Sequence, residues 1–155
     1  MNSSERREKT IHLFHNNYNC AQSVFSAYAS ELGIDEKTAR VAAAGFGGGM
    51  GALQKTCGAV TGGIMVLGGR FFDERDLPAS KTLVYKKTRE LIRQIERLYG
   101  SAACLDVLGT DIGTEEGLNR ARAADLFHLK CEPIILSACD ILDELLKENT
   151  KEYSS

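Results

Sequence analysis

The sequence lacks an excess of charge of either sign. Its formal net charge is −2 at pH 7, and lysines and arginines form no dense cluster. Nucleic acids and anionic membranes attract proteins through such basic clusters. We therefore expect neither a nucleic-acid partner nor a membrane partner.

A long apolar run is also missing. The most apolar stretch, residues 64–67, is far shorter than the roughly 20 residues that a membrane-spanning helix needs. The first residues, MNSSERREKTIHLF, lack the uninterrupted apolar core of a signal peptide. These two absences predict a soluble, cytoplasmic protein.

Strand signals are absent too. No segment alternates apolar and polar residues between turn signals, and there is no internal repeat or low-complexity linker. Apolar residues recur instead at helical spacing, and 155 residues suffice to bury one core without disulfides. The sequence predicts a single all-α domain over residues 1–155, folded as a compact bundle of about six helices.

Capping residues and glycines indicate where these helices begin and end. A short turn closed by Gly109 and a short helix near Thr114 are expected between the last two long helices, and the polar tail after residue 146 is expected to fray. The six main helices are predicted over residues 4–17, after Asn19, after Asp35, over residues 57–68 with Thr56 as cap, from Ser80 to Gly100, and from Pro133 onward.

Glycine is concentrated in one stretch of the chain. Ten of the fifteen glycines lie within residues 45–69, which run from a glycine-rich bend through Cys57 into an apolar helix. A glycine inside a helix costs about 1 kcal/mol relative to alanine, so these glycines need a reason in close backbone approach or unusual dihedral angles. Gly58 and Gly62 are therefore expected beside a bound cofactor, a second sulfur or another helix.

The five cysteines are an odd number for a secreted disulfide framework. Cys20, Cys57, Cys104 and Cys131 each fall at or just before a predicted helix start, where free N–H groups and the helix dipole favour a thiolate and lower the thiol pKa. Cys139 lies inside the last helix and is interpreted as a packed small hydrophobe.

Three histidines offer little more. His128, three residues before Cys131, is kept as a candidate metal ligand or proton acceptor, and the other two are interpreted as surface residues. There is no C-x-x-C-H motif for haem attachment, so haem is not expected.

The order of the cysteine motifs is distinctive. NCAQSV contains Cys20, TCGAVTGG contains Cys57, GSAACLDVLG contains Cys104, and KCEPII contains Cys131. This order, over residues 18–146, resembles the redox-active family named for its C_GCAxxG_C_C cysteine pattern. The resemblance implies a small helical redox protein that uses these four cysteines, with Cys139 as an addition.

Two functional hypotheses follow. In the first, the four cysteines converge as ligands of an iron–sulfur cluster or of zinc, or cycle through disulfides with Cys57 as nucleophile and Cys20 as resolving thiol, in exchange with an unidentified redox partner protein. The metal or cluster site is favoured, because four helix-start thiols exceed what a two-cysteine couple requires. In the second, the chain is a binding or scaffold module in which Gly58 and Gly62 line a pocket or the seam of a homodimer.

Overall fold

Eight α-helices and no β-strand make up the part of the chain that the structure, a computed structural model, describes: residues 1–147. The all-α prediction is confirmed, but six helices are too few, because the turn closed by Gly109 and the segment after Thr114 are helices in their own right. The expected fraying falls on residues outside the described part. The helices are α1 (Ser3–His15), α2 (Cys20–Ala29), α3 (Glu36–Ala42), α4 (Gly58–Phe71), α5 (Leu77–Tyr99), α6 (Cys104–Leu108), α7 (Glu115–Ala123) and α8 (Glu132–Lys147).

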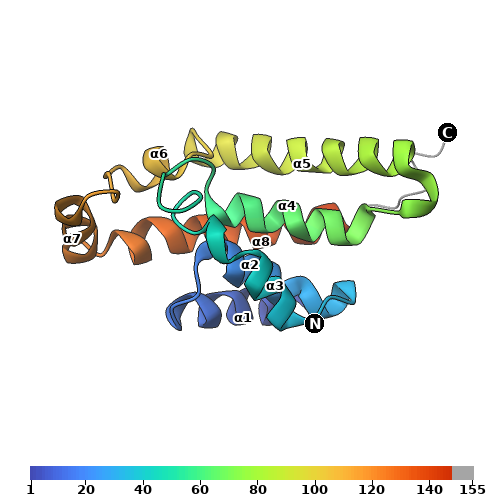
Figure 1. Ribbon diagram of the computed structural model, residues 1–155, viewed down its shortest axis with the longest axis horizontal. Helices are drawn as coiled ribbons and strands as arrows, with labels where there is room; N and C mark the ends of the chain where they lie inside the picture. The colour runs from blue at the N-terminus through green and yellow to red at the C-terminus, as the bar shows by residue number, and fades with distance from the viewer. Residues whose placement is uncertain (148–155) are drawn as a thin grey trace.

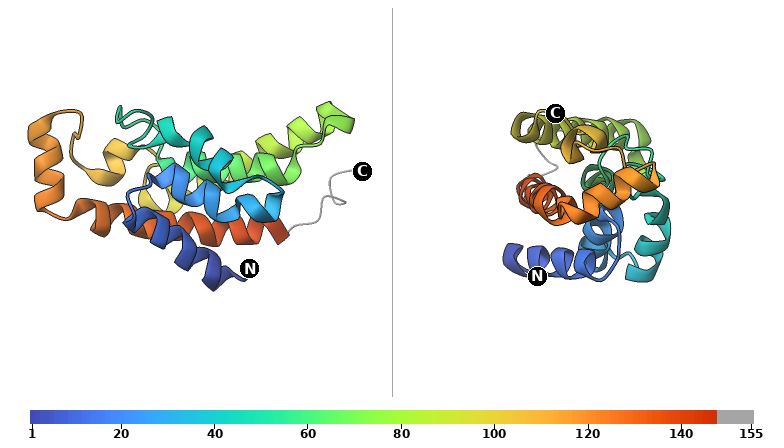
Figure 2. Two further views of the ribbon diagram at one scale, coloured as in Figure 1. Left: turned by 60° about the horizontal axis from the view of Figure 1, so that its bottom comes forward. Right: turned by 90° about the vertical axis from the view of Figure 1, so that its left-hand side faces the viewer.

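Helix α4 occupies the middle of the molecule, as its apolar sequence predicts. It packs against α2, α5 and α8, and α1 closes the bundle against α2 and α8 (Figure 1). Helix α7 stands apart at one end, where the chain turns back into α8 (Figure 2). No helix within residues 1–147 is long and apolar enough to cross a membrane.

The glycines of α4 allow α2 to cross it at close range. A Cβ atom at Gly58 would lie 2.9 Å from the Cβ atom of Cys20, and one at Gly62 would lie 2.8 Å from the carbonyl oxygen of Ala21. Real Cβ contacts are essentially never this short, so only glycine fits at either position without a shift of α2. The space beside these glycines is thus taken by α2 of the same chain.

Two predicted caps, Asn19 and Asp35, are confirmed, and Thr114, predicted near a helix start, also caps its helix. Asn19, Asp35 and Thr114 each accept a hydrogen bond from the backbone N–H three residues later, at the starts of α2, α3 and α7. These side chains occupy N–H groups that would otherwise lack a partner in the first helical turn. The sequence therefore predicts the start of α2, which carries Cys20, and the start of α7.

Two predicted caps are wrong. The N-cap of α4 is Cys57 and not Thr56, which instead forms an isolated antiparallel bridge with Ala103. Helix α5 begins at Leu77 and not after Ser80, because Asp76 caps it and Pro78 is tolerated in a first turn, where its missing N–H has no helical partner.

Candidate functional site

The starts of four helices bring four of the five cysteines together. Cys20 is the first residue of α2, Cys57 is the N-cap of α4, Cys104 is the first residue of α6, and Cys131 directly precedes α8. The thiol of Cys20 interacts electrostatically with the other three. Chain segments far apart in sequence thus meet at one place, as the resemblance implies.

Cys139 lies apart from this cluster. It is fully buried inside α8, and its Sγ atom is 3.5 Å from the hydroxyl oxygen of Thr10 in α1. Burial raises the pKa of the Cys139 thiol. Its place in the core agrees with the interpretation of this residue as a packed small side chain.

Backbone hydrogen bonds join the segment that carries Cys57 to the segment that carries Cys104. The N–H of Cys57 donates to the carbonyl of Ala102 at 2.8 Å, and the N–H of Cys104 donates to the carbonyl of Lys55 at 2.7 Å. Both bonds flank the bridge between Thr56 and Ala103. The segment before α4 and the segment before α6 therefore run antiparallel, and Cys57 and Cys104 lie on opposite sides of the bridge between Thr56 and Ala103.

The glycine-rich bend shapes this arrangement through a left-handed turn. Five consecutive residues, 48–52, have φ between 58° and 70°, and Gln54 follows with φ 56°. The carbonyls of Gly48 and Gly49 accept bonds from Gln54 and Lys55, both at 2.9 Å. Left-handed backbone costs roughly 1–2 kcal/mol for each residue with a Cβ atom, so the glycines lower the conformational cost of this turn. The surrounding structure holds Met50, Ala52 and Gln54 in the left-handed conformation.

Gly49 also leaves room for one of the cysteines. A Cβ atom at Gly49 would lie 2.8 Å from the Cβ atom of Cys104. Together with the contact between Gly58 and Cys20, this places two glycine backbones directly against cysteine side chains. The expectation that glycines surround the cysteines to permit close approach is met at these two positions.

Cys20 and Cys131 form the most closely coupled pair. They share a hydrogen bond, which raises the pKa of Cys20 and lowers the pKa of Cys131. Cys131 ends a π-helical turn, Phe127–Cys131, that precedes α8. Such turns widen a helix locally and are frequent at functional sites.

The other two thiols are held in their protonated form. Burial raises the pKa of Cys57 to about 12, although the N–H groups of Ala59 and Val60 at the start of α4 oppose this change. Burial likewise raises the pKa of Cys104 to about 11. The expectation that all four helix starts lower the thiol pKa is thus wrong for Cys20, Cys57 and Cys104, because desolvation, or in Cys20 the bond to Cys131, outweighs the helix start.

The pKa directions also differ between the thiols that are candidates for the nucleophile. A thiolate, and not a thiol, attacks a disulfide, so the cysteine with the lowered pKa is the better nucleophile. The contact with Cys20 lowers the pKa of Cys131, whereas burial raises the pKa of Cys57. Cys20, expected as the resolving thiol, is the hydrogen-bond partner of Cys131.

A family model matches residues 18–145 and is described as "Putative redox-active protein (C_GCAxxG_C_C)". The chain belongs to this family. The four cysteines that meet at the site, Cys20, Cys57, Cys104 and Cys131, all lie within the matched residues. Comparison with curated proteins and with solved structures gave no match.

The four cysteines of this C_GCAxxG_C_C protein offer the donor atoms of a metal site, but their arrangement in the described part of the chain is not that of a metal site. Four thiols are the usual donor set of an iron–sulfur cluster or a structural zinc ion. Within residues 1–147, however, no group of three or more histidine, cysteine, aspartate or glutamate side chains is placed so that it could hold a metal ion.

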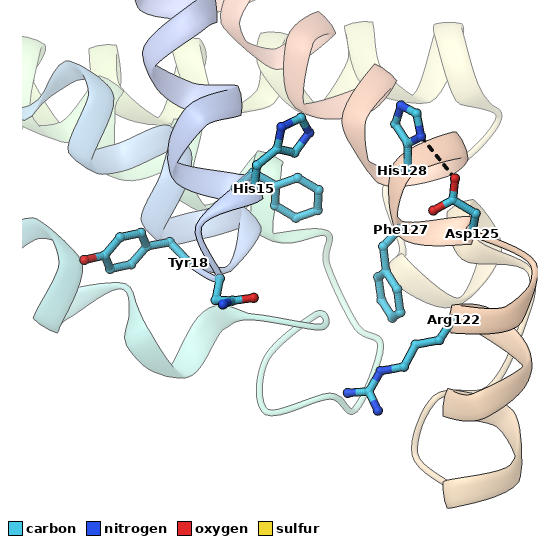
Figure 3. A pocket seen from close by; sticks show the side chains of 8 residues that line it. His15, Tyr18, Arg122, Asp125, Phe127 and His128 are labelled. Carbon is cyan, nitrogen blue, oxygen red and sulfur yellow. Dashed lines mark hydrogen bonds and ion pairs between the residues drawn. The ribbon is translucent and has the colours of Figure 1, made fainter.

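His128 faces carboxylates in this arrangement. Its Nδ1 atom lies 3.1 Å from Asp125 and its Nε2 atom 3.5 Å from Glu132, which also contacts His15 at 3.1 Å. Figure 3 shows His128 and His15 at the rim of an open cavity of about 390 Å³ between the end of α1 and the π-helical turn. A carboxylate thus lies beside each ring nitrogen of His128.

Sequence reasoning missed one residue of the site, Gln54. Its side chain is buried, donates to the carbonyl of Thr110 and accepts from the N–H of Ile112, and it opposes the rise that burial causes in the pKa of Cys104. Gln54 begins no helix and belongs to no apolar stripe, and its position beside Lys55 and Thr56 suggests a solvated loop. Only its closeness to Cys57 in the sequence could have drawn attention to it.

Proposed function

We propose that this C_GCAxxG_C_C protein is a thiol–disulfide redox protein whose reacting pair is Cys131 and Cys20. The meeting of helix starts carries the proposal, because it brings Cys20 and Cys131 together from distant parts of the sequence, and the contact between the two thiols lowers the pKa of Cys131. The pair thus combines a thiolate that can attack with a neighbouring thiol that can resolve the product.

The reaction is an exchange with a disulfide of a redox partner. The Cys131 thiolate attacks one sulfur of the partner disulfide, forms a mixed disulfide and releases the other partner sulfur as a thiolate. That thiolate takes up the proton of Cys20. The Cys20 thiolate then attacks the Cys131 sulfur and releases the second partner sulfur as a thiolate, which takes up from solvent the proton that Cys131 had given up. Two electrons pass from the protein dithiol to the partner, which becomes a dithiol, while Cys20 and Cys131 become a disulfide.

Trapping the mixed disulfide tests this proposal. The protein would be treated with 5,5′-dithiobis(2-nitrobenzoic acid), an aromatic disulfide, and its adducts would be mapped by mass spectrometry. The parent should end with a disulfide between Cys20 and Cys131, whereas Cys20→Ser should retain a mixed disulfide on Cys131. Cys139→Ala is the matched control and should behave as the parent. A disulfide that excludes both Cys20 and Cys131 would overturn the proposal.

The second candidate function is metal or cluster binding by all four thiols. It is favoured by the meeting of four sulfur atoms at helix starts, where the positive end of the helix dipole stabilises thiolate ligands. Bound there, an iron–sulfur cluster would supply one-electron transfer, and zinc would supply a structural link. Cys20, Cys57, Cys104 and Cys131 would be the ligands, and no haem is expected.

Metal and acid-labile sulfide content separates the two candidates. Protein purified anaerobically would be measured beside Cys57→Ser, which leaves the proposed reacting pair untouched. Iron and sulfide present in the parent and lost in the variant would favour the cluster. Disulfide exchange that proceeds equally in both proteins, without metal, would favour the thiol pair.

A further inference from the structure

The open cavity between the end of α1 and the π-helical turn has the size and the walls of a small-molecule site. Its volume is about 390 Å³. Two half-buried aromatic residues, Phe14 of α1 and Phe127 of the π-helical turn, line it and pack against the core behind it. Small-molecule sites have volumes of roughly 300–1,000 Å³ and mostly apolar walls with a few polar groups. The cavity is therefore large enough for one small molecule that has an apolar body.

The two chain junctions that form this cavity also carry the proposed reacting pair. Tyr18, in the junction between α1 and α2, lines the cavity two residues before Cys20. His128, in the junction between α7 and α8, lines it three residues before Cys131. A molecule held in the cavity thus contacts both segments that lead into the pair.

Arg122 is the cation of this cavity. Its side chain forms no ion pair and no hydrogen bond within residues 1–147. Arg120, in the same last turn of α7, instead pairs with Glu116 at 3.2 Å. A guanidinium binds a carboxylate through two parallel N–H donors. The charge that Arg122 brings to the cavity is therefore available to a bound anion.

The carboxylates near the cavity face histidine and not this arginine. Asp125 lies 3.1 Å from Nδ1 of His128, and Glu132 lies 3.5 Å from Nε2 of the same ring. Figure 3 shows Phe127 between Arg122 on one side and Asp125 with His128 on the other. A ligand whose ring lies against Phe127 can thus reach Arg122 with a carboxylate on the side away from the protein's own acidic groups.

We propose that the cavity binds a small aromatic carboxylate, with its ring against Phe14 and Phe127 and its carboxylate on Arg122, and so selects the small disulfide that oxidises the pair of Cys20 and Cys131. The selection rests on the exchange proposed above, whereas the binding does not. Aromatic rings stabilise one another by stacking, and the ion pair with arginine fixes the orientation of the ligand. Holding a disulfide in one orientation beside the pair favours its reaction.

Two aromatic disulfides test the selection. 5,5′-Dithiobis(2-nitrobenzoic acid) carries a carboxylate on each ring, whereas 4,4′-dithiodipyridine carries none. The rate at which each one oxidises the proposed pair would be followed at neutral pH by the release of its coloured thiol, with the disulfide mapped by mass spectrometry. Arg122→Gln should slow the reaction with the carboxylate reagent about fivefold, the size of one partly exposed ion pair, and leave the other rate unchanged.

Arg120→Gln is the matched control. Both arginines are exposed and lie in the last turn of α7, so each variant loses the same charge from the same helix end. Only Arg122 lines the cavity, so the control should keep both rates of the parent. Equal slowing of the carboxylate reagent in the two variants would show that net charge alone acts, and would overturn the inference.

Binding is tested without any thiol reaction by titrating 2-nitrobenzoate, which contains no sulfur, into isotope-labelled protein. The NMR amide signals of residues 14–18 and 122–128 should shift, and the dissociation constant should rise about fivefold in Arg122→Gln but not in the control. Unshifted signals at these residues would overturn the inference and leave the proposed pair untouched. If these signals shift but the reagents oxidise other cysteines, the proposed function and the selection are both wrong and the binding site stands.

Discussion

The thiol of Cys20, at the start of α2, shares a hydrogen bond with the sulfur of Cys131, which directly precedes α8. The bond makes the two thiols unequal, because it raises the pKa of one and lowers the pKa of the other. An unequal pair is what an exchange reaction requires, since one sulfur attacks as a thiolate and the other keeps its proton until it resolves the intermediate.

Selective alkylation follows from this inequality. At pH 7 and limiting iodoacetamide, Cys131 should be modified before the other four cysteines, because it alone has a lowered pKa. Cys20→Ala removes the hydrogen bond and should slow the modification of Cys131 by about tenfold. Peptide mass spectrometry measures both. Faster modification of Cys57 than of Cys131 in the parent would contradict the assignment.

The helix starts that carry the cysteines could be predicted, but their reactivity could not. Capping residues such as Asn19 and the apolar run after Cys57 are local signals, and they placed the cysteines at helix starts. The order of pKa values depends on which sulfur is desolvated and which one donates a hydrogen bond. Those relations arise only when α2 crosses α4 and the π-helical turn places Cys131 against Cys20, and no sequence spacing encodes them.

Two glycines of α4 should respond oppositely to alanine. A Cβ atom at Gly62 would meet the carbonyl oxygen of Ala21 at 2.8 Å, so Gly62→Ala should lower the free energy of unfolding by about 1–3 kcal/mol. Gly68 has nothing within 4 Å of the same position, so Gly68→Ala should raise it by up to about 1 kcal/mol through helix propensity. Urea unfolding measures both. Equal effects of the two substitutions would refute the close crossing of α2 over α4.

Stability should fall at alkaline pH because of the buried thiols. The pKa of Cys57 is raised to about 12 in the folded protein, against about 8.5 for an unfolded cysteine. Its contribution to stability is therefore complete below pH 8.5 and is lost as pH rises from there toward 12. The loss approaches about 1.4 kcal/mol per pH unit for this group.

Urea unfolding in reducing buffer between pH 7.5 and about 9.5 tests this, in the range before tyrosines ordinarily ionise. Cys57→Ala should be less stable than the parent at neutral pH but should lose less stability as pH rises. Parallel curves for the two proteins would show that the Cys57 thiol is not desolvated in the folded state.

The N-caps of α1 and α2 are alike, so substitutions in them can separate an effect on stability from an effect on redox chemistry. Asn2 and Asn19 each form a capping box, with Glu5 in α1 and with Gln22 in α2, and each accepts a backbone bond, at 2.9 Å and 2.8 Å respectively. Replacing either by alanine should lower the free energy of unfolding by about 1 kcal/mol.

Only Asn19 precedes a cysteine of the cluster, and its Nδ2 atom also donates to the carbonyl of Ala44 at 3.0 Å beside the glycine-rich bend. Asn19→Ala should therefore loosen the first turn of α2, weaken the bond between Cys20 and Cys131, and shift the potential of that pair in a glutathione titration. Asn2→Ala should lose similar stability with no shift. If both variants moved the potential equally, the cap of α2 would act through general stability, and the geometry at Cys20 would not set the chemistry of Cys131.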